Sequence, residues 1–224
     1  MRAVADGVFE VRVAHVHAHL VVTDGGVVLV DTGLPGRGSR TIERALRDVR
    51  RSVGEVTTIL VTHRHDDHVG GLAELRRRSG ATVVAHVIDV PFITGQRTAQ
   101  NPPLLRLLST LMRTADPAPV DEALTADGPF SVPGFTAVHT PGHTLGHVSF
   151  LLDRDGGVLF AGDAAGGVPG GRVRGSPGPV TDDAAAAKHS LKRLATLDFR
   201  VAVFGHGPAV RDAAVKRFRA LAAR

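Results

Sequence analysis

The sequence predicts an α/β domain in which strands and helices pack as layers. Short apolar runs of strand length alternate with longer segments of helical periodicity, and this pattern occurs twice along the chain. Hydrophobic residues make up 43% of the 224 residues, which is enough for a sizeable core. No Pro/Ser-rich linker or block of charge divides the chain, so we expect a single domain over residues 1–224.

The first half of the chain predicts strands followed by helices. Asp24-Gly25-Gly26 favours a tight turn between the second and third strands. The first helix has its apolar residues on one face, and Ser39 is its expected N-cap. The expected strands are 8–13, 20–23, 27–30, 58–62 and 81–85, and the expected helices are 39–49 and 70–78.

The second half repeats this order. Strands are expected to dominate from Phe135 to Phe160, and the glycine-rich segment 166–172 is expected to form a flexible loop. A helix over 182–197 is expected to be capped by Thr181 or Asp182. A strand over 201–204 and a closing helix over 209–222 complete the pattern.

A cluster of metal-ligand residue types occupies positions 63–68, which read His-Arg-His-Asp-Asp-His directly after an apolar run. Neutral imidazole and carboxylate are ligands for zinc, iron and manganese. His63 and His65 are two residues apart, so an extended backbone directs both to one side. Asp67 and His68 are adjacent, so their side chains diverge and can serve a second ion. A solvated polar loop does not account for so many ligand groups in six positions.

Three later segments each bring a His or Asp to the end of a strand-like run, with glycine alongside. Strand ends that meet at one edge of a sheet build a rigid polar site from distant parts of the sequence. The segments are 139–147, 159–164 and 201–207, and they contain His143, Asp163 and His206.

Taken together, these motifs resemble those of the metallo-β-lactamase-fold hydrolase superfamily, from Val8 to about Val215. The matching segments are Leu29-Val30-Asp31-Thr32-Gly33, Thr62 to Gly71, Thr140-Pro141-Gly142-His143-Thr144, Ala161-Gly162-Asp163 and Gly205-His206-Gly207. The resemblance implies a four-layer αββα sandwich, in which two sheets face each other, helices lie outside and the metal site lies at one edge of the sheets.

The resemblance also implies two divalent metal ions. The first would be bound by His63, His65 and His143, the second by Asp67, His68 and His206, and Asp163 would bridge them. Asp31 is expected either to lie buried behind the ligands or simply to form a turn. Zinc is the first choice of metal, and iron or manganese also suits the ligands, because a chain without cysteine offers only nitrogen and oxygen donors.

A metal-dependent hydrolase follows from this site. A bound dication lowers the pKa of water from about 15.7 to about 7, and two ions roughly 3.5–4 Å apart can hold the resulting hydroxide between them. Asp67 is the expected catalytic residue, which would orient the nucleophile and pass its proton to the leaving group. The motifs offer no Cys, Ser or Lys nucleophile, so we expect direct hydrolysis without a covalent intermediate.

Four classes of carbonyl substrate are candidates for the bond that is cleaved: a lactone, thioester, ester or β-lactam. Glyoxalase-II-like thioesterases carry a helical glutathione-binding region where this chain has one expected helix after His206. Homoserine-lactone hydrolases rely on a tyrosine, which this chain lacks, and β-lactamases generally lack a bridging carboxylate such as Asp163. Two alternatives are a phosphodiesterase of the same fold and a mononuclear iron persulfide dioxygenase. The dioxygenase would use only His63, His143 and Asp163. An oxygen-reducing di-iron protein normally has Glu in place of His65.

The composition limits which binding partners we expect. The net charge is +5 and the pI is about 10.8, but the arginines are scattered over helix faces, and there is no Tyr or Trp to stack on bases. We therefore expect a small-molecule substrate and no nucleic acid. No signal-peptide core and no apolar run of about 18 residues is visible, so we expect a cytoplasmic protein without a membrane span. The oligomeric state is open, with a homodimer as one option.

The segment around 86–127 is expected to be a helical insertion that caps the site. A leucine-rich helix over 102–114 would favour a hydrophobic acyl chain or ring, or would simply pack onto the domain. The remaining histidines have less definite roles. His15, His17 and His19 alternate and would share one face of a strand, His139 and His147 could support ligands, and His86 and His189 are expected at the surface.

Overall fold

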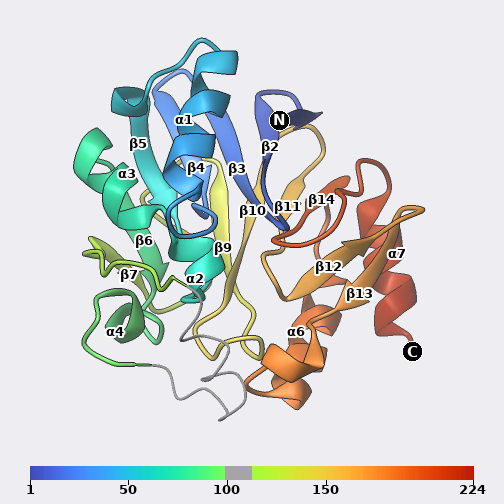
Figure 1. Cartoon of the computed structure of the whole chain (residues 1–224). Coiled ribbons are helices and arrows are strands. Elements are labelled where there is room, and N and C mark those ends of the chain that lie inside the picture. Colours follow the sequence, from blue (N-terminus) through green and yellow to red (C-terminus); the bar gives the residue numbers. More distant parts are fainter. Residues whose placement is uncertain (99–112) are drawn as a thin grey trace.

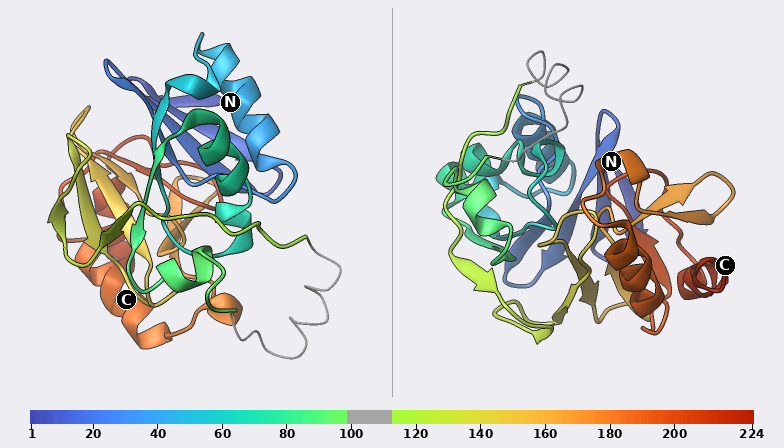
Figure 2. Two further views of the ribbon diagram at one scale, coloured as in Figure 1. Left: turned by 90° about the vertical axis from the view of Figure 1, so that its left-hand side faces the viewer. Right: turned by 90° about the horizontal axis from the view of Figure 1, so that it is seen from below.

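Two β-sheets lie face to face, and helices cover the outer face of each sheet (Figures 1 and 2). The structure is a computed structural model, and it describes residues 1–98 and 113–224. The order of layers is helix, sheet, sheet, helix, which is the predicted αββα sandwich. No helix in these two stretches is long and apolar enough to cross a membrane.

The first sheet has seven strands that follow one another in sequence order. Its first four strands are antiparallel, and from the fourth strand onward the pairs are parallel. The strands are β1 (Arg2–Ala5), β2 (Val8–Val13), β3 (Val16–Thr23), β4 (Gly26–Val30), β5 (Val56–Leu60), β6 (Thr82–His86) and β7 (Glu122–Leu124). The connections contain α1 (Gly38–Asp48), η1 (Val53–Glu55), α2 (Asp66–Val69), α3 (Leu72–Ser79) and α4 (Val90–Ile93).

The second sheet has five strands in the order β14-β11-β10-β9-β8, in which only the β11–β14 pair is parallel. Its strands are β8 (Gly128–Pro129), β9 (Phe135–His139), β10 (Val148–Leu152), β11 (Val158–Phe160) and β14 (Val201–Val203). A separate hairpin is made by β12 (Ala165–Val168) and β13 (Arg172–Gly175). The helical elements of this half are η2 (Gly178–Val180), α6 (Ala184–Leu194) and α7 (Ala214–Ala222).

Three apolar cores separate the four layers. The inner core lies between the sheets, where Val21 and Leu60 from the first sheet meet Phe150 and Phe160 from the second. One outer core packs α1 and α3 onto the first sheet, and the other packs α6 and α7 onto the second. Alternate residues of β3 and β4 pack into the outer and the inner core, because successive side chains of a strand point to opposite faces.

The sheets present several strand ends at one edge. The chain leaves β4, β5, β11 and β14 at this edge, and the β9–β10 connection and the β2–β3 turn lie there as well. Two backbone hydrogen bonds join the sheets at the edge, from Val148 N to Thr62 O and from His17 N to Gly205 O, both 2.8 Å. Every segment that was predicted to carry a ligand therefore ends in one place.

Several predicted elements need correction. Ser39 is not a cap: α1 begins at Gly38, and the buried Ser39 hydroxyl instead donates to Glu74. The cap of α6 is Asp183, whose carboxylate accepts from the N–H groups of Ala185 and Ala186 at 2.9 Å. The closing helix begins at Ala214 rather than near residue 209.

The glycine-rich segment 166–172 is also not a loop. It forms most of the β12–β13 hairpin, and the N–H of Gly167 donates to the carbonyl of His206 at 3.0 Å. Any Cβ at Gly167 would overlap the carbonyl of Pro208, so glycine is required for this close backbone approach. The predicted helix over 102–114 lies almost entirely outside the described residues, and the capping role of 86–127 stays a prediction.

The inner core sets the stability of the sandwich. Phe150 is fully buried between the sheets, so Phe150→Ala removes its transfer free energy and leaves a cavity. We expect a loss of about 3–5 kcal/mol in the free energy of unfolding, measured by chemical denaturation. Val180→Ala, at a position 41% exposed, is the control and should change it by less than about 0.5 kcal/mol. Equal effects of the two substitutions would contradict this account of the core.

Candidate metal centre

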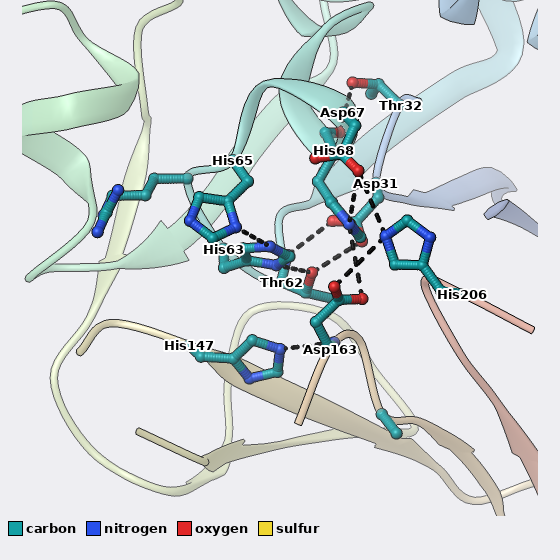
Figure 3. Close-up of polar contacts among 12 residues, drawn as sticks. Asp31, Thr32, Thr62, His63, His65, Asp67, His68, His147, Asp163 and His206 are labelled. Carbon is teal, nitrogen blue, oxygen red and sulfur yellow. Dashed lines mark hydrogen bonds and ion pairs between the residues drawn. The ribbon is translucent and has the colours of Figure 1, made fainter. Parts of the chain in front are cut away.

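The predicted site residues meet at the shared edge of the sheets, and Figure 3 labels all of them except His143. His63 and His65 follow β5, and Asp67 and His68 lie in the short helix α2. The later segments contribute His143 from the β9–β10 connection, Asp163 after β11 and His206 after β14. All seven side chains that were predicted to bind metal belong to groups whose donor atoms lie within 4.8 Å of one another.

The first group consists of three imidazoles. His65 Nδ1 lies 3.1 Å from His63 Nε2 and 3.0 Å from His143 Nε2. His63 and His143 are buried, whereas His65 is half-buried. Ring nitrogens that face each other at such distances share either a proton or a cation.

The second group consists of Asp67, His68 and His206. His206 Nε2 lies 3.3 Å from Asp67 Oδ2, and His68 Nε2 lies 3.9 Å from the same oxygen. His68 is fully buried, whereas the Asp67 side chain is 26% exposed. This group therefore offers a carboxylate that is open to solvent beside a buried imidazole.

Asp163 lies between the two groups. Its Oδ2 is 3.5 Å from His143 Nε2 and 3.4 Å from His206 Nε2, and its Oδ1 is 3.6 Å from His68 Nε2. The side chain is only 6% exposed. One carboxylate thus faces donors from both groups, and Figure 3 shows its contacts with His68 and His206.

Four of the five imidazoles are held in place through their outward-facing nitrogen. Such contacts fix the ring orientation and decide which nitrogen faces the centre. The pairs are His63 Nδ1 with Thr62 Oγ1 at 3.0 Å, His68 Nδ1 with Asp31 Oδ2 at 2.8 Å, His143 Nδ1 with Ser176 Oγ at 3.0 Å, and His206 Nδ1 with the carbonyl of His15 at 3.0 Å.

Asp31 supports the ligand loop and does not itself face the centre. Its carboxylate accepts from the N–H of Thr62 at 2.8 Å, from the Thr62 hydroxyl at 2.7 Å and from His68 Nδ1 at 2.8 Å. The residue has φ 59°, a left-handed conformation that Asp tolerates better than most residues. Of the two roles expected from the sequence, the structure supports the buried one behind the ligands.

His147 and two glycines hold Asp163 in position. His147 Nε2 accepts from the N–H of Asp163 at 3.0 Å, and its Nδ1 lies 2.8 Å from Thr140 Oγ1. A Cβ at Gly162 would press on the His147 ring, and one at Gly205 would overlap Asp163 Oδ1 and the His68 ring. Only glycine therefore allows β11 and β14 to bring their ends this close to the site.

The electrostatics of the cluster favour a cation. Burial and the neighbouring imidazoles lower the pKa values of His63 and His143, and burial with Arg64 lowers that of His65 to about 4, so these rings are neutral donors at pH 7. Burial also acts to lower the pKa of His68, but the carboxylates around it, those of Asp163, Asp31 and Asp67, raise it to about 10. An added positive charge would thus stabilise the three carboxylates around His68.

The donor set fits a divalent metal ion. In a tetrahedral zinc site with Zn–N distances of about 2.0–2.1 Å, neighbouring donors lie about 3.3 Å apart, and the separations here span 3.0 to 3.9 Å. His68 Nε2 and Asp163 Oδ1 are buried without a hydrogen-bond partner among the described residues. Buried polar atoms of this kind usually have a ligand or water to contact. The residues could therefore hold divalent ions.

Asp89 joins the two ligand loops, a role that was not predicted from the sequence. Its buried carboxylate accepts from the N–H of Arg64 at 3.0 Å and from the Thr144 hydroxyl at 2.8 Å. Arg64 turns away from the centre, lies over the Phe92 ring and pairs with Asp182 at 2.8 Å. A single Asp between a strand and a short helix carries no distinguishing pattern, so only the fold reveals its role.

The remaining histidines divide in a way that the sequence did not predict. His17 and His19 lie in β3 and are buried, whereas His15 is exposed in the β2–β3 turn. His86 is also buried and stacks on His139 at 4.0 Å, so its expected surface position was wrong. The exposed position of His189 is confirmed, and His139 supports the ligand loop by donating to the carbonyl of Leu145 at 2.9 Å.

Comparison with known proteins identifies the family. A family model described as the metallo-beta-lactamase superfamily matches residues 11–206. A Bacillus subtilis protein named "Probable metallo-hydrolase YflN" is 31% identical in an alignment of 204 positions that covers 80% of this chain and 75% of that protein. A hydroxyacylglutathione hydrolase of Xanthomonas axonopodis is 30% identical over 179 residues, which is 80% of this chain but only 54% of the relative.

The fold gives the same result. The solved structure of the Rm3 metallo-β-lactamase superposes with a TM-score of 0.71 at 28% identity, covering 92% of this chain and 77% of that structure. The match in sequence extends from β2 to His206, so it includes every predicted ligand. The chain therefore belongs to the metallo-β-lactamase superfamily, as one of its metallo-hydrolases.

Proposed function

We propose that this protein hydrolyses a small carbonyl substrate at a centre of two divalent metal ions. The observation that carries the proposal is the arrangement of two donor groups on opposite sides of one buried carboxylate, that of Asp163. A site for one ion would need only three or four of these donors. The second group adds three donors, which would serve another ion.

In this proposal His63, His65 and His143 hold the first ion, and the second group holds the other. Asp163 contributes to both. Ions bound there would supply an acidified water and polarise the substrate carbonyl. We expect zinc, because five imidazoles and two carboxylates suit it, and iron or manganese also fits this donor set.

Asp67 is the proposed catalytic residue. Its carboxylate is the most exposed acidic group of the centre, and it is held between His206 Nε2 at 3.3 Å and His15 Nε2 at 3.9 Å. Burial acts to raise the pKa of Asp67, but the adjacent His68 and His206 hold it well below its usual value, so the group is ionised. An ionised, open carboxylate can accept a hydrogen bond from water, orient it and carry its proton to the leaving group.

Thioesters are the first carbonyl class to test. The curated relatives include hydroxyacylglutathione hydrolases and the thioesterase pkgB of Emericella nidulans, the latter 29% identical over 197 residues. This chain spans about half the length of these relatives, so their substrates are a guide to the class of bond only. Esters, lactones and β-lactams belong in the same panel because they react through the same attack on a carbonyl.

Metal content and hydrolysis together test the proposal. We expect the purified protein to bind about two divalent ions per chain and to hydrolyse at least one carbonyl substrate, and a chelator should abolish the activity. His206→Ala should leave about one ion and lower kcat by more than about 100-fold, the upper limit for residues that only orient ligands. Elemental analysis and a substrate panel of thioesters, esters, lactones, β-lactams and phosphodiesters provide the measurements.

Three outcomes would contradict this proposal. One iron per chain with oxygen uptake would indicate a dioxygenase, and cleavage of phosphodiesters alone would indicate a phosphodiesterase. Unchanged hydrolysis in Asp67→Ala would exclude the proposed role of that carboxylate. His189→Ala, at an exposed position on α6, is the matched control for the loss of an imidazole and should retain both ions.

The close approach at Gly205 gives a separate prediction for the second ion. In Gly205→Ala the new methyl group overlaps Asp163 Oδ1 and the His68 ring, so at least one of these donors must move. We expect the second ion to bind at least about 10-fold more weakly while the first stays bound. Gly178→Ala, where a Cβ would meet nothing within 4 Å, should leave both affinities unchanged. Full occupancy of both sites in Gly205→Ala would refute this account.

Asp89 gives the complementary prediction for the first ion. Asp89→Ala removes the acceptor that joins the loop of His63 and His65 to the loop of His143. We expect a 10- to 100-fold loss of affinity at the first site, as for other residues that orient ligands, measured by metal titration. The control Asp182→Ala removes only the outer partner of Arg64 and should have a smaller effect. An equal loss from both substitutions would show that Asp89 has no special role.

A further inference from the structure

A pocket of about 540 Å³ opens beside the metal centre, next to the β2–β3 turn. Its lining includes Arg2, Glu10, Arg12, His15, His17 and Gly207. None of these residues was predicted to bind metal, and only His15 takes part in the proposed centre, through its contacts with Asp67 and His206. The pocket is formed by the ends of two antiparallel strands on one side and by the loop after β14 on the other.

The pocket adjoins the second group of donors through His15 and Gly207. The His15 ring stacks on the His206 ring, with 5.7 Å between centroids and 12° between planes. The carbonyl of His15 accepts from His206 Nδ1 at 3.0 Å, and Gly207 directly follows His206 in the chain. His15 therefore lies between the pocket and the second group of donors.

Two buried polar side chains lie in the pocket with unused hydrogen-bonding atoms. Glu10 and His17 are both 8% exposed, and Glu10 Oε2 and His17 Nδ1 have no hydrogen-bond partner among the described residues. The two atoms lie 3.9 Å apart. Both atoms are closed to solvent, so they lie behind the surface of the pocket and leave its open face to the arginines.

The charge of the pocket is positive. Arg2 and Arg12 line it, and neither forms an ion pair within 4 Å with a carboxylate in the described parts of the chain. Arg12 donates from Nε to the carbonyl of Ala14 at 2.7 Å, which fixes the side chain and leaves its terminal NH₂ groups available. Glu10 is the single carboxylate in the lining, so its charge offsets only one of the two guanidinium groups.

A third metal site is a weaker explanation for these residues. Glu10 and the histidines of β3 do not form a set of three donors within 4.8 Å of one another in the parts of the chain that the structure describes. The guanidinium groups at the same pocket would also repel a cation. An anion, by contrast, can accept from both arginines.

We propose that this pocket binds an anionic group at the end of the substrate, with Arg12 and Arg2 as its partners and His15 beside its path to the metal centre. The proposal rests on the hydrolase function proposed above and names the substrate class: a thioester or ester with a carboxylate or phosphate at its distal end. The anion is recognised away from the scissile carbonyl, so it contributes to binding and selection and not to the chemical step.

Paired substrates test the pocket. Each anionic thioester, with a carboxylate or a phosphate tail, is compared with a neutral analogue of the same length, using protein with both ions bound. We expect Arg12→Gln to lower kcat/KM for the anionic member by about 10- to 100-fold, mainly through KM, since one charge-assisted hydrogen bond to a charged group is lost. The neutral member should be cleaved as before. Comparing carboxylate with phosphate tails identifies the natural anion.

The matched control is Arg44→Gln, which removes an exposed arginine of α1 far along the chain from the pocket. It should leave the preference for the anionic substrate intact. Arg12→Glu should reverse the preference in favour of a substrate with an ammonium tail. Equal kcat/KM for anionic and neutral substrates in the wild type, or a preference that survives in both Arg2→Gln and Arg12→Gln, would overturn the proposal.

A binding measurement separates this inference from the hydrolase proposal. Calorimetric titration of the metal-loaded protein with α,ω-dicarboxylates from succinate to suberate, each against the monocarboxylate of equal length, requires no turnover. We expect one length of dicarboxylate to bind at least about 10-fold more tightly than its partner, and Arg12→Gln to remove that difference. Such binding without hydrolysis of any substrate would leave the pocket standing and refute the hydrolase proposal. Hydrolysis without any such difference in binding would support the hydrolase proposal and refute the proposed anion pocket.

Discussion

The arrangement of the site depends on one buried carboxylate that faces imidazoles from both halves of the chain. Asp163 is nearly inaccessible to solvent, and both of its oxygens lie 3.4–3.6 Å from ring nitrogens. An ionised carboxylate in such a place is costly unless positive charge lies beside it. Burial accordingly raises the pKa of Asp163, while His68 and His206 act to lower it. Divalent ions would satisfy the carboxylate and the neutral imidazoles at the same time.

Much of this arrangement could be predicted because its signals are local. The order of apolar runs and helical segments predicted the layers, and the ligand types directly after strands predicted which side chains would meet. β2 has the predicted bounds, Val8–Val13, because four of its six residues are Val or Phe, which favour strands. His63, His65 and their partners could be assigned because the motifs that carry them resemble those of the metallo-β-lactamase superfamily.

The features that were missed depend on contacts between distant segments. Asp89 has no pattern around it, and its role follows only from the approach of two loops. Segment 166–172 looks flexible because of its glycines, yet these glycines are what allow a strand to pack against the loop of His206. The cap of α6 was misplaced by one or two residues, because neighbouring Asp182 and Asp183 are equally suitable in sequence and only the fold selects Asp183.

The two backbone hydrogen bonds that join the sheets have a wider consequence. Val148 N–Thr62 O and His17 N–Gly205 O are the seams along which the N-terminal and C-terminal halves meet at the site. Neither half supplies all of the proposed ligands of either ion: the first half lacks His143, and the second half lacks His68. Ions bound here would link the two halves across this seam. Ion binding would therefore stabilise the docking of the halves, and incorrect docking would weaken ion binding. Metal binding in such a protein would therefore depend on the correct docking of its two halves.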